Sequence, residues 1–118
     1  MKIQLHTQKL RVRIDEDELQ RLLSGDLIEN VTLLGPATSW RFALRLATQD
    51  YPQLECRSMD WALQLPQEAV HVFSSRLPCR DGLEFMLPGG NGHALAVIFD
   101  VDVRDSARVR GRRGAAPA

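Results

Sequence analysis

Apolar and polar residues alternate over much of this chain, and the spacing changes where strands give way to helices. Residues 9–14 alternate with a period of two, which predicts a strand with one apolar face. From Asp15 the spacing becomes helical, and Glu18 completes a capping-box pattern with Asp15. The apolar positions are Leu10, Val12 and Ile14 in the strand and Leu19, Leu22 and Leu23 in the helix. Strand and helix therefore turn their apolar sides toward one core.

The same patterns predict seven further strands and a second helix. A Thr7-Gln8 turn joins a strand over 2–6 to the strand over 9–14, which predicts a hairpin. The other strands are expected over 27–34, 40–47, 54–57, 61–65, 83–87 and 93–103, with a helix from Pro66 to about Ser75 and a flexible loop over 88–92. About eight short strands joined mainly by tight turns favour an α+β fold. We expect a curved antiparallel sheet, open or rolled into a partial barrel, covered by two helices.

The chain repeats its own pattern at an offset of 51 residues. Each half reads strand, strand, helix, strand, strand, and the offset places Leu44 and Leu46 on Leu95 and Val97. The agreement is one of pattern rather than of residue identity. A ββαββ duplication and a chance match of two amphipathic units are therefore both open.

Length and composition indicate a single globular domain. A chain of 118 residues suits one core, and 44% apolar and 25% charged residues argue against disordered, collagen-like and disulfide-scaffold classes. The net charge of zero hides an asymmetry, because residues 104–118 hold five arginines and one aspartate. We expect a mildly acidic domain over 1–103 and a flexible basic tail over 104–118.

Cysteine usage and hydropathy predict the compartment. Cys56 and Cys79 lack metal or redox spacing and are expected to be reduced, partly buried thiols. No run of 18 apolar residues and no secretory pattern occurs. We expect a cytoplasmic protein without a membrane segment.

Four arginines are the main candidate for a binding site. Arg11 and Arg13 share one strand face, and Arg41 and Arg45 share another. If the two strands are close together, their guanidinium groups form a surface for phosphate or carboxylate ligands. The alternative is that these arginines pair across strands with Glu55, Glu84, Asp100 and Asp102, and this alternative is favoured.

Other candidate chemistry is weaker. Asp100 and Asp102 lie on one face of the last strand and are weak candidates for metal ligands, since no third ligand is predicted beside them. His6, His71 and His93 fall on separate elements without metal or triad spacing. No cofactor and no catalytic residue is predicted, and the arginine-rich tail is interpreted as a solubilising end, so nucleic acid is an unlikely partner.

Short motifs resemble those of a family of small bacterial domains of unknown function. The motifs are Met1-Lys2-Ile3, Leu10-Arg11-Val12-Arg13-Ile14, the acidic start of the first helix and Leu63-Gln64-Leu65-Pro66. The resemblance implies a cytosolic bacterial protein and no activity. The sequence therefore favours a non-enzymatic binding or protein-interaction domain with an unknown protein partner or self-association. The open alternatives are a domain or enzyme that takes a small anionic ligand on the arginines, and weak nucleic-acid contact through the tail.

Overall fold

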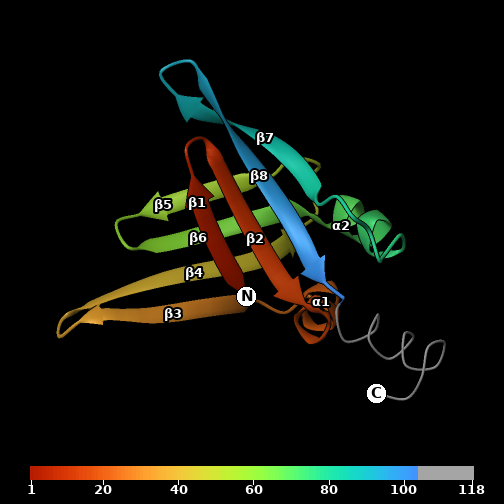
Figure 1. Ribbon diagram of the computed structural model, residues 1–118, viewed down its shortest axis with the longest axis horizontal. Helices are drawn as coiled ribbons and strands as arrows, with labels where there is room; N and C mark the ends of the chain where they lie inside the picture. Colours follow the sequence, from red (N-terminus) through yellow and green to blue (C-terminus); the bar gives the residue numbers. More distant parts are fainter. Residues whose placement is uncertain (104–118) are drawn as a thin grey trace.

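A computed structural model describes residues 1–103 as eight strands and two helices (Figure 1). In chain order these are β1 (Lys2–His6), β2 (Lys9–Asp15), α1 (Glu16–Leu23), β3 (Ile28–Gly35), β4 (Thr38–Ala47), β5 (Gln53–Arg57), β6 (Asp60–Pro66), α2 (Gln67–Ser74), β7 (Leu83–Gly90) and β8 (His93–Asp102). The predicted α+β class, with eight strands and two helices, is confirmed. The expectation of a basic tail over 104–118 lies outside the described residues.

The strands form two four-stranded sheets rather than one. Sheet 1 has the order β1-β2-β8-β7 and sheet 2 the order β3-β4-β6-β5. Hairpin partners are antiparallel, whereas the central pairs β2·β8 and β4·β6 are parallel. The expected curved antiparallel sheet or partial barrel is therefore wrong. Each helix carries the chain from one sheet to the other. In sheet 2 the link over 48–52 leads from β4 to the far edge strand β5, and β6 returns between them, so that it runs parallel to β4.

The two sheets pack face to face, and both helices lie at the same side of the pair (Figure 1). The strands of one sheet cross those of the other in this view, and α1 contacts strands of both sheets. Among residues 1–103 every buried side chain is apolar. The core cluster consists of Leu10, Val12, Ile14, Leu19, Leu22, Ile28, Phe42, Leu44, Leu63, Leu65, Val70, Phe73, Val97 and Phe99. Because strand residues alternate between faces, the charged residues of β2 and β4 point away from this core.

The repeated ββαββ pattern is present, but its offset differs between the parts of each half. Strands β1 and β2 and helix α1 match β5, β6 and α2 at the predicted offset of 51 residues, whereas β3 and β4 match β7 and β8 at 55. The link from helix to strand covers 24–27 in the first half and 75–82 in the second. The longer second link moves the equivalent of Leu44 from Leu95 to Phe99.

The link between β7 and β8 is also shorter than predicted. Strand β7 continues through Pro88 to Gly90, so the expected loop over 88–92 reduces to the turn at Asn91 and Gly92. Both turn residues have positive φ values, 51° and 77°, as a tight two-residue hairpin turn requires. Within residues 1–103 no helix is long and apolar enough to cross a membrane.

The predicted capping box at the start of α1 is confirmed. The Glu18 N–H donates to Asp15 Oδ1 (2.7 Å), and the Asp15 N–H donates to Glu18 Oε1 (3.0 Å). Two amide groups that the helix cannot satisfy internally are thereby paired. The cap sits at the point where β2 becomes α1, so it fixes the direction in which the chain leaves sheet 1.

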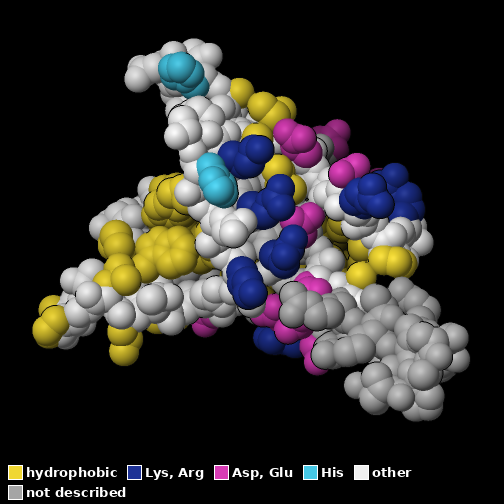
Figure 2. Space-filling model, in the orientation of Figure 1, with side chains coloured by type: hydrophobic (Ala, Val, Ile, Leu, Met, Phe, Trp, Pro, Cys, Tyr) yellow, Lys and Arg dark blue, Asp and Glu magenta, His cyan; other side chains and the backbone are white. Residues whose placement is uncertain are grey.

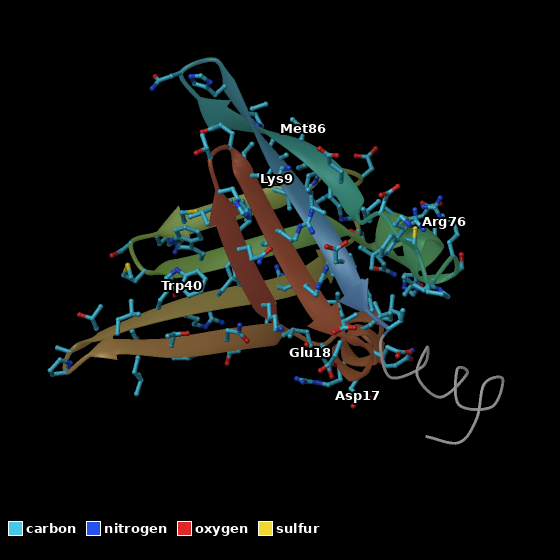
Figure 3. The ribbon with its side chains drawn as sticks, viewed as in Figure 1. Lys9, Asp17, Glu18, Trp40, Arg76 and Met86 are labelled. Atoms are coloured by element: carbon cyan, nitrogen blue, oxygen red, sulfur yellow. The ribbon has the colours of Figure 1, made fainter. Side chains whose placement is uncertain are left out.

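Asp15→Ala is expected to lower the free energy of unfolding by about 0.5–2 kcal/mol, the usual cost of losing such a cap. Urea denaturation measures the loss. Asp17→Ala is the control, because Asp17 lies in the same first turn without a cap bond (Figure 3). It is expected to cost only the dipole contribution, about 0.3–1 kcal/mol. Equal losses in both variants would contradict the capping role.

Candidate functional site

The four candidate arginines lie on opposite faces of the molecule. Arg11 and Arg13 are on β2, on the outer face of sheet 1. Arg41 and Arg45 are on β4, on the outer face of sheet 2. The buried core lies between the two pairs. A surface made of all four guanidinium groups would require the two strands to lie close together with their charged faces on one side. The structure does not meet this requirement.

On sheet 2 the arginines belong to a network across the strands. Arg41 Nε lies 2.7 Å from Glu29 Oε2 on β3, and Arg41 Nη1 lies 2.9 Å from Asp60 Oδ1 on β6. The hydrogen bonds that Arg41 donates to Asp60 and Glu29 raise the pKa of its guanidinium group. Arg45 lies opposite Gln64 in the register of β4 and β6. Arg41 therefore has its charge balanced within the sheet, by two carboxylates other than those predicted.

On sheet 1 one carboxylate serves both arginines. Asp100 Oδ2 lies 3.5 Å from Arg11 Nη1 and 3.7 Å from Arg13 Nη2, and the Asp100 side chain is only 13% exposed. This part of the cross-strand pairing is as predicted. Asp102 lies on the same face opposite Asp15. Within residues 1–103 no three His, Cys, Asp or Glu side chains are grouped to hold a metal ion.

The structure adds two lysines to the outer face of sheet 1. The β1–β2 register places Lys2 opposite Arg13 and Lys9 opposite His6. Side chains of opposite residues in an antiparallel pair point the same way. We call the surface formed by Lys2, Lys9, Arg11 and Arg13 the basic face; it forms a column of positive side chains over β1 and β2 (Figure 2).

Within the described residues, few carboxylates balance the positive charge of the basic face. Asp100 is the carboxylate that lies within 4 Å of its arginines, and Lys2 and Lys9 form no ion pair with any part of 1–103. A depression over the β1–β2 hairpin is lined by Gln4, His6, Thr7, Lys9 and Arg11. The position of Lys2 and Lys9 on this face could be predicted from the sequence, because the Thr7-Gln8 turn of the predicted hairpin sets the register of the two strands.

Reactive side chains elsewhere are scattered. Cys56 and Cys79 are free and exposed, which corrects the expected partial burial. The Cys56 thiol is partly desolvated although the residue is exposed, and this desolvation raises its pKa and disfavours the reactive thiolate. The three histidines are exposed and lie on β1, α2 and β8.

A second depression lies beside α2, where Ala69 and Val72 face Leu83. Its charged lining residues, Asp50, Glu68 and Arg76, have mixed signs. The depression therefore offers no charge selectivity comparable with that of the basic face.

Comparison with protein-family models, with characterised proteins and with solved structures finds no match for this chain.

Proposed function

We propose that this chain is a non-enzymatic binding domain whose basic face binds an extended acidic segment of another protein. The observation that carries the proposal is the convergence of Lys2, Lys9, Arg11 and Arg13 on one sheet face, where Asp100 forms ion pairs with the two arginines and not with the lysines. The other carboxylates of this face are Asp15 at the end of β2, where it caps α1, and Glu84 and Asp102 on β7 and β8. The hairpin side of the face thus has an excess of positive charge.

The spacing of these charges suits an extended peptide. Lys9, Arg11 and Arg13 are alternate residues of β2, so their side chains repeat about every 6.6–6.8 Å. An extended peptide with an acidic residue at every second position repeats its carboxylates at the same interval. Each arginine can also present two parallel donors to one carboxylate.

The internal repeat offers a comparison within the same fold. At the offset of 51 residues the cations of the basic face correspond to uncharged or acidic residues of sheet 2. In the order Lys2, Lys9, Arg11 and Arg13, these residues are Gln53, Asp60, Ala62 and Gln64. The ββαββ architecture therefore does not require cations at these positions, which supports a role for them in binding.

The chemistry of this face favours a peptide over single-stranded nucleic acid. Nucleic-acid platforms combine basic side chains with aromatic rings on which bases stack. Among the described residues, the outward-facing positions of sheet 1 include no Phe, Tyr or Trp. The cations instead share their face with Gln4 and His6 on β1.

Fluorescence anisotropy with a labelled peptide of alternating Glu and Ser tests the proposal. The chain is expected to bind this peptide, with affinity that falls as salt rises, and not a peptide with Gln in place of Glu. Lys2→Gln/Lys9→Gln is expected to weaken binding about three- to thirtyfold, because each exposed charge contact contributes about 0.3–1 kcal/mol.

Arg45→Gln/Arg57→Gln is the matched control, because it removes the same charge from the outer face of sheet 2. This control is expected to leave the affinity unchanged. Equal effects of both double variants, or an unbound acidic peptide, would refute the proposal. Tighter binding of single-stranded DNA than of the peptide would replace it with nucleic-acid recognition.

A further inference from the structure

Strand β3 forms an open edge of sheet 2. It pairs with β4 on one side, and no strand of the described chain pairs with its other side. In Figure 1 the β3–β4 hairpin extends past the rest of the sheet, with β3 along the lower border. An open edge presents backbone N–H and C=O groups that can pair with another extended chain.

The composition of β3 differs from that of the other edge strands in residues 1–103. Strand β1 contains Lys2, β5 contains Glu55 and Arg57, and β7 contains Glu84 and Pro88, whereas the one charge of β3, Glu29, is paired with Arg41 of the same sheet. Charges and proline at an edge are common means of preventing association. The six residues 30–35 of β3, Asn-Val-Thr-Leu-Leu-Gly, contain neither.

Large apolar side chains of β3 are exposed along this edge. Val31 is 57%, Leu33 81% and Leu34 55% exposed. At the 55-residue offset, Leu33 corresponds to Pro88 of β7, and both strands have a register irregularity just after these positions. The edge strands β3 and β7 therefore share this irregularity, but only β7 has a proline at the position before it.

We propose that β3 pairs antiparallel with β3 of a second copy of this chain, joining two sheets into one of eight strands. A two-fold axis at Thr32 places Val31 of each copy opposite Leu33 of the other, on the same face of the joined sheet. Glu29 then lies opposite Gly35, so no like charges meet. A second copy fits because the one charge of this strand, Glu29, does not meet itself across the axis, so the strand is complementary to itself, as a two-fold interface requires.

Analytical ultracentrifugation of the full chain tests the pairing. The wild type is expected to be a monomer–dimer equilibrium, and Val31→Glu is expected to raise its dissociation constant by at least about tenfold, since it places a charged carboxylate against Leu33 of the other copy. Val31 lies opposite Arg41 on β4, so glutamate is compatible with the fold of the monomer.

Met86→Glu is the matched control, because Met86 occupies the equivalent position of β7 and is 59% exposed. It lies far from β3, at the other side of the molecule (Figure 3), and is expected to leave the dimer unchanged. A wild-type monomer at all concentrations, an assembly larger than a dimer, or equal effects of the two variants would refute the proposal.

Cross-linking tests the register directly. In a Cys56→Ser/Cys79→Ser background, Thr32→Cys is expected to form a disulfide-linked dimer on oxidation, since opposite residues of paired strands lie about 4.5–5.5 Å apart. Ser39→Cys on β4 is the control. The two β4 strands of the dimer are three strand spacings apart, so about 14 Å or more would separate the two cysteines. Efficient cross-linking at Ser39 but not at Thr32 would contradict the register.

Discussion

Phe99→Ala is expected to remove about 3–5 kcal/mol from the free energy of unfolding, the usual cost of deleting a buried phenylalanine ring. Phe99 is fully buried on β8, opposite Val12 of β2 and Leu83 of β7. Its ring meets Phe73 of α2 edge to face, with centroids 6.0 Å apart. It therefore links the middle of sheet 1 to a helix, and alanine would leave a cavity that three elements border.

Urea denaturation at one protein concentration measures this loss. Because domains of this kind are stable by only about 5–15 kcal/mol, the variant is expected to unfold at a much lower urea concentration. Phe85→Ala is the control, since Phe85 is also on sheet 1 but is only partly buried on the edge strand β7. A loss in Phe99→Ala no greater than that in the control would show that Phe99 is not central to the core.

Gly82→Ala is expected to destabilise the domain by about 1–3 kcal/mol, the usual cost of forcing extra atoms into a packed site. A Cβ atom at Gly82 would overlap the Asp100 carboxylate and would lie 2.7 Å from Ile98 Cγ2 and 3.0 Å from the Phe99 carbonyl oxygen. The carboxylate cannot move without weakening its contacts with both arginines of β2. The link from α2 to β7 would therefore have to shift.

Gly35→Ala provides the comparison for this substitution. A Cβ atom at Gly35 meets no atom within 4 Å, so this variant is expected to stay within about 0.5 kcal/mol of the wild type. Asp100→Ala added to Gly82→Ala should restore part of the lost stability, because the effects of substitutions at residues in contact are not additive. If Gly82→Ala proves as stable as Gly35→Ala, the close approach of residue 82 to Asp100 does not contribute to the stability of the domain.

The candidate site was only partly predictable. Of the four carboxylates predicted to pair with the arginines across strands, Asp100 does so, with Arg11 and Arg13. Lys2 and Lys9 join the same face through the hairpin register. The carboxylates that hold Arg41 could not be named, since this required knowing that β4 lies between β3 and β6.

By itself, the sequence determined which residues form strands and helices and which side of each meets the core. Alternation along β2 and the capping box at Asp15 involve residues a few positions apart, so the information is local. The α+β class and the repeated pattern follow from the same periodicities.

Only the tertiary structure decided which strands are neighbours. Periodicity states that Arg11 and Arg41 each point away from a core, but it contains nothing about which sheet each strand joins. That choice depends on the path of α1 and α2 between the two sheets and on the long-range pairs β2·β8 and β4·β6. The two halves of the chain pair through these central strands, and this arrangement places Arg11 and Arg13 on the opposite face of the molecule from Arg41 and Arg45.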